Sequence, residues 1–351
     1  MFGTDGIRAR VGAGPLALEN VLAIGRAVGR LLVDEPSALG VEPRNGTPRR
    51  VLVGRDTRGS GPMLERLLVA GLESQGIELV QAGVIPTPGV AHLVSAEGFD
   101  LGAVVSASHN PYPDNGLKFF DRRGRKLPRE AEEAIERACQ RAAAGVVERI
   151  RAARLDDDAG RRYFASMLED PTLDVDLEGF RVVLDCANGA VGAIALPPAF
   201  YNLGVQASFL ANEPDGFNIN EACGATDPEA MRREVVRRGA DLGFSFDGDG
   251  DRVILADEEG GLVDGDSMLA ILALDLAARG QLSVPIVVGT VLSNFGLEKC
   301  LAAHGIELVR TPVGDRHVAE KMAETGALLG GEPSGHIVFG DRQGLLTGDG
   351  L

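Results

Sequence analysis

Residues 104–120, VVSASHNPYPDNGLKFF, join an apolar strand to a polar loop, and this junction decides the fold class. The apolar, β-branched run Leu101–Val105 predicts a buried central strand. Ser108 and His109 follow it, and Pro111 excludes a helical backbone at the residue before it. Ligands of open α/β sheets bind at the carboxyl ends of strands. The stretch therefore predicts an α/β fold with Ser108 in a candidate site, although serines in loops also form ordinary turn hydrogen bonds.

A serine hydrolase is the first chemistry to consider for this loop, and the residues argue against it. Ser108 and His109 are sequence neighbours, so their side chains diverge. The chain also contains no G-x-S-x-G motif. The serine therefore needs a different partner.

The composition limits the classes of partner. A chain of 351 residues is long enough for two to three domains, and its formal charge of -16 argues against binding nucleic acid. An anionic ligand must then be held by local cations and helix N-termini. No leader peptide precedes Phe2 and no apolar run approaches membrane length, so we expect a cytoplasmic protein without a membrane partner.

The four cysteines are scattered and include no C-x-x-C pair: Cys139, Cys186, Cys223 and Cys300. This spacing indicates neither a disulfide scaffold nor a zinc site, and it favours a reducing compartment.

A β-α-β pattern occurs three times, with first strands near Val51, Val182 and Pro285. Each unit then contains a further apolar strand, namely Leu101–Val105, Asp241–Phe246 or Ala327–Gly330. These strands end in SASHNP, DGDGDR and GEPSGH. Because each copy carries a different polar loop at the same place, we expect three similar α/β domains with mixed sheets around a central cleft. We place them at residues 1–153, 154–255 and 256–351.

Other segments are assigned by their local pattern. Helical periodicity or composition predicts helices at Leu18–Val33, Pro62–Gln75, Pro128–Ala153 and Arg161–Leu168, and an exposed connection at Glu35–Arg50. The N-terminal FGTDGIR segment is either a flexible leader or a backbone loop that brings Arg8 to an anion.

Asp247, Asp249 and Asp251 alternate with glycines directly after an apolar strand. Three carboxylates this close repel one another unless a cation lies among them, and carboxylate oxygens suit Mg²⁺. A calcium EF-hand is the alternative, because Glu258 also falls at its spacing. It fails because Arg252 stands where that loop requires Gly and because the flanks predict strands. The loop therefore predicts a Mg²⁺ site.

Further candidates lie in the first and third loops. Lys118, between apolar neighbours, and His109 could stabilise charge or shuttle protons around a phosphate on Ser108. Glu332, Ser334 and His336 suit recognition of a polyhydroxyl ligand. Arg310, Asp315 and Arg316 are further possible contacts, although surface ion pairing is the commoner fate of such residues.

These motifs together resemble the α-D-phosphohexomutase family over essentially the whole chain. The segments that carry the resemblance are FGTDGIR, GRDTRGSG, SASHNP, DNGLKFF, NIN with CGAT, DGDGDR, TPVGD and GEPSGH. The resemblance implies that Ser108 is phosphorylated and that its phosphate binds one Mg²⁺ together with Asp247, Asp249 and Asp251. It implies sugar contacts from Glu332 and Ser334, with His336 and Arg310 as further substrate ligands. Arg8, Lys118 and Arg252 would support the transfer.

The CGAT and GGEPSGH segments favour the amino-sugar subgroup of that family. The implied reaction interconverts glucosamine 6-phosphate and glucosamine 1-phosphate through a bisphosphate, and a hexose 1,6-bisphosphate would act as activator. Such an enzyme serves amino-sugar nucleotide and cell-wall precursor synthesis, and a homodimer is compatible with it. Mutases of mannose or glucose phosphates, a Mg²⁺-dependent phosphatase and a sugar-phosphate binding protein are the alternatives.

Two departures from the family pattern bear on these expectations. Ala9 stands where the family usually has Gly. The phosphate-gripping R-x-S-G-T-E loop of the family's fourth, C-terminal domain is missing from these 351 residues. We therefore expect a truncated chain that retains metal binding but is a poor mutase.

Overall fold

The computed structural model describes residues 1–3, 5–43, 47–141, 153–168, 177–194, 204–340, 346–348 and 350. The chain forms two compact units. Unit 1 comprises residues 1–173, 193–195 and 214–219, and unit 2 comprises residues 174–192, 196–213 and 220–351. The units are described separately below.

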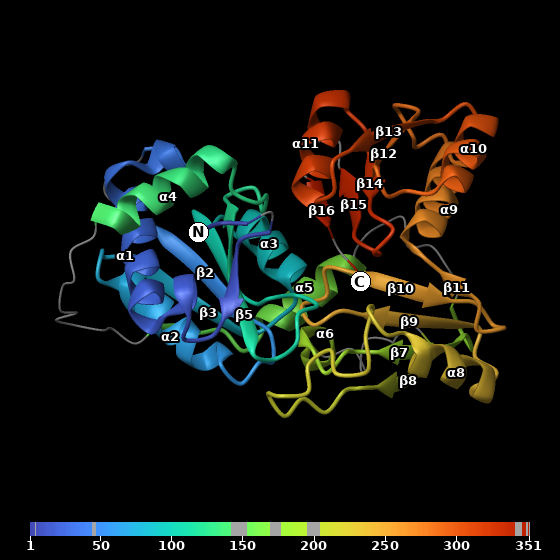
Figure 1. Cartoon of the computed structure of the whole chain (residues 1–351), viewed down its shortest axis with the longest axis horizontal. Helices are drawn as coiled ribbons and strands as arrows, with labels where there is room; N and C mark the ends of the chain where they lie inside the picture. The colour runs from blue at the N-terminus through green and yellow to red at the C-terminus, as the bar shows by residue number, and fades with distance from the viewer. Residues whose placement is uncertain are drawn as a thin grey trace. The chain divides into compact units, whose positions relative to one another are not determined.

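Unit 1 contains a six-stranded mixed sheet in the order β1-β5-β4-β2-β3-β6 (Figure 1). Its strands are β1 Ile7–Arg10, β2 Arg50–Arg55, β3 Glu78–Val84, β4 Leu101–Val105, β5 Asp114–Asp121 and β6 Arg154–Leu155. Its helices are α1 Leu18–Asp34, α2 Gly61–Glu73, α3 Thr87–Ala96, α4 Arg129–Arg141 and α5 Ala159–Leu168, with short 3-10 helices at Gly14–Leu16 and Pro36–Leu39.

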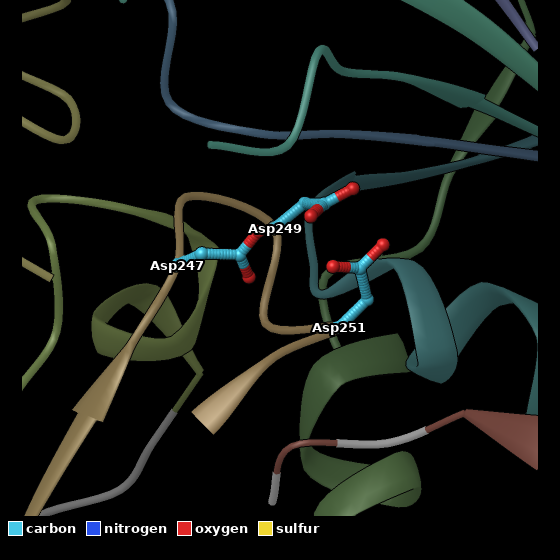
Figure 2. Close-up of side chains that lie close together, drawn as sticks. All are labelled: Asp247, Asp249 and Asp251. Atoms are coloured by element: carbon cyan, nitrogen blue, oxygen red, sulfur yellow. The ribbon is translucent and has the colours of Figure 1, made fainter. Parts of the chain in front are cut away.

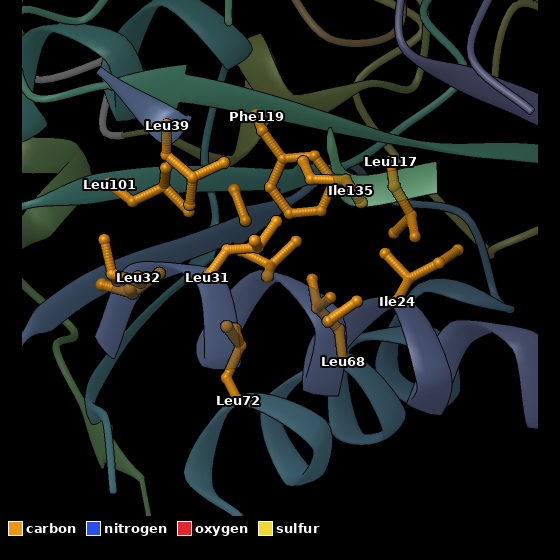
Figure 3. Close-up of a cluster of buried hydrophobic side chains, with 14 of the residues drawn as sticks. Ile24, Leu31, Leu32, Leu39, Leu68, Leu72, Leu101, Leu117, Phe119 and Ile135 are labelled. Carbon is orange, nitrogen blue, oxygen red and sulfur yellow. The ribbon is translucent and has the colours of Figure 1, made fainter. Parts of the chain in front are cut away.

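The core of unit 1 lies between this sheet and helices α1, α2 and α4 (Figure 3). Ile24 and Leu31 of α1 recur at helical spacing, so one apolar stripe faces Leu101 and Phe119 of the sheet. The opposite face of the sheet is covered by α3, whose Val90 packs close to Gly54 and Gly102. With helices on both faces, β4 is buried along its whole length, and its loop begins from a rigid centre.

Unit 2 contains two five-stranded mixed sheets. The first has the order β11-β10-β9-β7-β8, from β7 Arg181–Asp185, β8 Gln206–Leu210, β9 Leu242–Phe246, β10 Val253–Ala256 and β11 Leu262–Val263. The second has the order β13-β12-β14-β15-β16, from β12 Ile286–Thr290, β13 Glu307–Thr311, β14 Leu329–Gly331, β15 Ile337–Gly340 and β16 Leu346–Gly348. The helices are α6 Ala190–Ala193, α8 Glu229–Arg238, α9 Gly265–Ala278, α10 Phe295–Ala303 and α11 Asp315–Thr325.

The three sheets share one strand arrangement. In each sheet the first strand of the repeat pairs in parallel with both the second and the third strand. The third strand pairs antiparallel with the strand that follows it, giving β4 with β5, β9 with β10 and β14 with β15. SASHNP, DGDGDR and GEPSGH therefore occupy the turns of three equivalent hairpins. The predicted fold class and the threefold repeat are confirmed, while the predicted domain boundaries stay a prediction.

The local assignments differ in three places. The connection Glu35–Arg50 is not simply exposed, because Leu39 and Val41 join the core. The helix predicted at Pro128–Ala153 is described only over Arg129–Arg141, and its remainder to residue 152 lies outside the described residues. The flexible leader is wrong, because Ile7–Arg10 pairs with β5. Among the described helices, none has the length and apolarity needed to span a membrane.

Candidate active site

The serine loop, residues 106–113, leaves β4 in a constrained conformation. Ser108 is fully buried and has a φ of 52°, a left-handed backbone that non-glycine residues rarely adopt. The Ser106 hydroxyl donates to Oδ2 of Asp56 at 2.7 Å and accepts the Ser108 N–H at 2.9 Å. This conformation stores strain, and such strain is concentrated at functional sites.

Arg58 anchors the serine loop through hydrogen bonds to its backbone. Its guanidinium is fully buried and donates to the carbonyl oxygens of Ser108 and Asn110, both at 2.8 Å, and of Pro111 at 2.6 Å and Asp114 at 3.0 Å. Its Nε donates to Asp56 at 2.9 Å. The planar guanidinium can contact all these acceptors at once, which a lysine cannot do. The Asp56–Arg58 pair therefore sets the backbone path around Ser108.

A cluster of cations surrounds Asp5 beside β5. Lys118, which is 2% exposed, lies 3.1 Å from Asp5 Oδ2, and Lys126 and Arg8 also contact the Asp5 carboxylate. Burial alone would raise the pKa of Asp5, but these three cations hold it well below its usual value. Ammonium and guanidinium groups such as these are the side chains that bind phosphate ligands.

Two predicted residues approach the serine from this side. Nη1 of Arg8 lies 3.4 Å from Oδ1 of Asn110, in the serine loop. His109 Nδ1 is 3.4 Å from Ser108 Oγ, which is longer than a good hydrogen bond. Unit 1 thus gathers Arg8, Ser108, His109 and Lys118 around one loop.

Replacing Asp5 with Asn is expected to destabilise the protein in a pH-dependent way. The lowered pKa means that ionised Asp5 contributes stability above the unfolded-state pKa of about 3.9, and this is lost as the pH falls through the folded-state pKa. We expect a loss of about 2 kcal/mol at pH 7 that shrinks steadily below pH ~4. Urea unfolding of both proteins across this range measures it. Asp34→Asn, which affects an exposed pair with Arg30, should show little effect at any pH.

The metal loop, residues 247–252, brings three carboxylates together (Figure 2). Asp247, Asp249 and Asp251 are buried, and one carboxylate oxygen from each lies within 4.8 Å of the others. The loop is closed by hydrogen bonds from the Asp247 N–H to the Arg252 carbonyl and from the Gly250 N–H to the Asp247 carbonyl. Buried carboxylates at this spacing match the oxygen ligands of a hard divalent cation. The residues therefore fit Mg²⁺.

Arg252 is the nearest cation to this triad in the same loop. Its Nε lies 3.9 Å from Asp251 Oδ1, and its side chain is partly buried. Arg252 thus offsets part of the negative charge of the three carboxylates.

The CGAT segment, residues 223–226, is hydrogen-bonded to the residues beside the metal loop. Asp185, at the end of β7, accepts the N–H of Gly224 at 2.8 Å and of Ala187 at 3.0 Å, and burial raises its pKa. The Ala225 N–H donates to the carbonyl of Phe246, directly before the triad. Gly224 has a φ of 79°, and a Cβ there would lie 2.7 Å from the Phe246 carbonyl oxygen. The segment thus fastens β7 to the start of the metal loop.

Burial disfavours the thiolate forms of the two cysteines in this region. Burial raises the pKa of Cys186 and of Cys223 to about 12 each, so both thiols stay protonated at neutral pH. The CGAT segment therefore contributes to the structure of the site through its backbone hydrogen bonds.

The third loop, residues 332–336, packs against the strand that follows the metal loop. The Val253 N–H donates to the Gly335 carbonyl at 3.1 Å, and a Cβ on Gly335 would lie 2.0 Å from the Val253 carbonyl oxygen. The His336 imidazole lies between Asp251 at 4.0 Å and Asp315 at 3.5 Å. Within unit 2 the metal loop and the third loop are therefore in direct contact.

The other predicted ligands of this loop lie in different surroundings. Glu332 is buried and accepts the Gly314 N–H of the TPVGD segment at 2.9 Å, while Ser334 is exposed. Arg310 donates to the carbonyls of Thr290 and Ser293 and pairs with Glu298 at 2.9 Å. These contacts give Arg310 a role in shaping the turn before α10, and its contact with a substrate stays a prediction.

The residues that sequence reasoning passed over are Asp5, Asp56, Arg58 and Asp185. Each lies in or beside a motif quoted for the resemblance or at a strand end. A charged residue directly after an apolar strand, as at Asp56 and Asp185, is the signal that could have found two of them.

Comparison with known proteins agrees with this architecture. Three family models of phosphoglucomutase/phosphomannomutase alpha/beta/alpha domains match the chain: domain I at residues 1–145, domain II at 161–261 and domain III at 264–351. The chain belongs to the phosphoglucomutase/phosphomannomutase family. The resemblance drawn from the motifs is confirmed, and Ala9 is accommodated in the regular pairing of β1 with Asn115.

Individual members of the phosphoglucomutase/phosphomannomutase family give the same result. A phosphoglucosamine mutase of Anaeromyxobacter dehalogenans is 45% identical, and the match covers 100% of this chain and 76% of that protein. A crystal structure of a family protein from Burkholderia thailandensis is 27% identical, has a TM-score of 0.78, and is covered over 75% of its length. A putative phosphomannomutase from Thermus thermophilus, 23% identical with a TM-score of 0.85, is similar in fold; the match covers 100% of this chain and 77% of that structure.

Proposed function

We propose that the chain acts as a phosphoglucosamine mutase, converting glucosamine 6-phosphate and glucosamine 1-phosphate into each other through a phosphoserine at Ser108. The observation that carries the proposal is the buried triad Asp247, Asp249 and Asp251, held on a hairpin turn in a member of this family. The 45% identity to a phosphoglucosamine mutase supports the choice of sugar.

In the first half of the proposed reaction, the P–O bond to Ser108 Oγ breaks and the phosphoryl group passes to a free hydroxyl of the bound sugar phosphate. The hydroxyl loses its proton to a nearby base, and Ser108 Oγ regains one. His109 is the candidate for these proton transfers because its Nδ1 lies 3.4 Å from Ser108 Oγ.

The resulting sugar bisphosphate then turns over, and its other phosphoryl group returns to Ser108. Lys118 and Arg8, oriented by Asp5, would stabilise the negative charge on the phosphoryl oxygens. A Mg²⁺ ion held by the three aspartates would supply further charge neutralisation for the transfer. Glu332, Ser334 and His336 would bind the sugar.

The central test of this proposal is the Ser108→Ala variant. The wild-type chain, incubated with Mg²⁺ and a hexose 1,6-bisphosphate, is expected to gain one phosphoryl group by intact-mass measurement. Ser108→Ala should gain none, because it lacks the accepting oxygen. Ser95→Ala, which changes an exposed serine of α3, should be labelled like the wild type.

The same incubation separates the proposed mutase from the alternatives. Release of inorganic phosphate without isomerised sugar would indicate a phosphatase. A wild-type chain with neither adduct nor turnover would contradict the proposal and leave only sugar-phosphate binding.

A further inference from the structure

A short segment of the second repeat, Pro214–Ile219, packs with unit 1 although the chain on both sides of it belongs to unit 2. We call this segment the strap. The Gly59 N–H donates to the Gly216 carbonyl at 2.8 Å, and a Cβ on Gly59 would lie 3.3 Å from that oxygen. Gly59 directly follows Arg58, whose guanidinium holds the serine loop. The strap therefore contacts the backbone that supports Ser108.

A second contact joins the strap to the serine loop itself. The ring of Phe217 meets the ring of Tyr112 edge to face, with centroids 5.5 Å apart and planes at 82°. Tyr112 lies four positions after Ser108 in the same loop. Both rings are substantially exposed, at 60% for Phe217 and 44% for Tyr112. An aromatic pair that buries so little surface contributes little to folding but does fix one segment against another.

The strap has its own internal structure. Oδ1 of Asp215 accepts the N–H groups of Phe217 at 2.7 Å and Asn218 at 2.9 Å, and Oδ1 of Asn218 accepts the Asp215 N–H at 3.1 Å. These reciprocal side-chain bonds define a tight turn. Phe217 therefore lies in a turn that hydrogen bonds within the strap stabilise.

The residues that follow the strap contact the chain at the end of β7. The Asn220 N–H donates to the Ala187 carbonyl at 2.9 Å, and Asn220 and Ala222 have left-handed φ values of 56° and 52°. Gly224, eight positions after Gly216, bonds to Asp185 beneath the metal loop. Beyond the strap the chain is therefore held by contacts within unit 2.

We propose that the strap holds the serine loop in the conformation needed for phosphorylation of Ser108, with Phe217 and Tyr112 as positioning residues. The inference rests on the proposed function, because it assigns the strap the task of holding Ser108 in the position from which it accepts and donates a phosphoryl group. Phosphoryl transfer depends mainly on such positioning, and a displacement of about 1 Å can cost about a hundredfold in rate.

The test uses Phe217→Ala, Tyr112→Ala and the double variant in the full chain. The measured quantity is the rate at which a hexose 1,6-bisphosphate phosphorylates Ser108 with saturating Mg²⁺, followed by intact mass. We expect each single variant to slow this rate by about tenfold or more. The double variant should be no slower than the worse single variant, because both changes remove the same contact. Phe217→Tyr, which keeps the ring, should restore most of the rate.

Two controls make the result specific to the strap. Phe295→Ala removes a phenylalanine of matching exposure, 62%, from α10 and should leave the rate unchanged. The Mg²⁺ concentration for half-maximal thermal stabilisation should be unchanged in all four variants, because the triad belongs to unit 2. Phe217→Ala at wild-type rate, or single losses that multiply in the double variant, would overturn the inference. A wild-type chain that is never phosphorylated would instead overturn the proposed function and, with it, this inference.

Discussion

Replacing Asp249 with Asn is expected to weaken Mg²⁺ binding by at least about a hundredfold, because changes even to residues behind a metal's ligands cost about 10–100-fold. The substitution preserves size but removes one of three negative charges from a buried cluster. Calorimetric titration of metal-stripped protein with Mg²⁺ measures the affinity directly.

Thermal unfolding gives an independent measure of the same loss. Mg²⁺ at a hundred times its dissociation constant should stabilise the wild-type protein by about 2.7 kcal/mol. This gain should be nearly absent in Asp249→Asn. Without metal the variant should be at least as stable as the wild type, because one like-charge repulsion has been removed. Asp275→Asn, on the exposed part of α9, should bind Mg²⁺ like the wild type. Equal affinities for wild type and Asp249→Asn would show that the triad is not the metal site.

Replacing Arg58 with Met is expected to destabilise unit 1 by about 3–5 kcal/mol, the usual cost of leaving a buried charge unpaired. The buried Asp56 carboxylate would lose its cation, and the carbonyl oxygens of three loop residues and of Asp114 would lose a donor. Urea unfolding followed by circular dichroism measures the change. Phosphorylation of Ser108 should fall at the same time, because the loop would leave its left-handed conformation.

Two further variants test why this arginine is needed. Arg58→Lys keeps the charge but not the planar fork, so most of the loss should remain. Arg129→Met changes an arginine with a 78% exposed side chain, paired with Glu133, and should shift stability by no more than about 0.5 kcal/mol. If Arg58→Met unfolded with a wild-type midpoint, the guanidinium would not be what holds the loop.

Much of the fold could be predicted because its signals are local. Apolar strands, helical periodicity and polar strand ends lie within a few residues of one another, and the alternating aspartates of the metal loop are a local pattern too. The three hairpin turns follow from the repeat, since each strand and its loop are contiguous. The carboxylates of Asp247, Asp249 and Asp251 lie close together, as that spacing indicated.

The supports of the site were not predictable in the same way. Arg58 contacts the carbonyl of Asp114, which is 56 positions away, and a buried arginine has the same local signature as an exposed one. Asp5 meets Lys126 across 121 positions, so its lowered pKa depends largely on tertiary contacts with Lys118 and Lys126. The burial of Leu39 was missed because the surrounding Pro, Gly and Asn residues are typical of exposed connections.

The equivalence of the three hairpins has a consequence for how such a protein can arise. If one ancestral gene segment was duplicated twice, the copies could keep their strand pairing while mutations accumulated in the turns. The serine loop, the metal loop and the third loop could then change separately, each tolerated by a scaffold already able to fold.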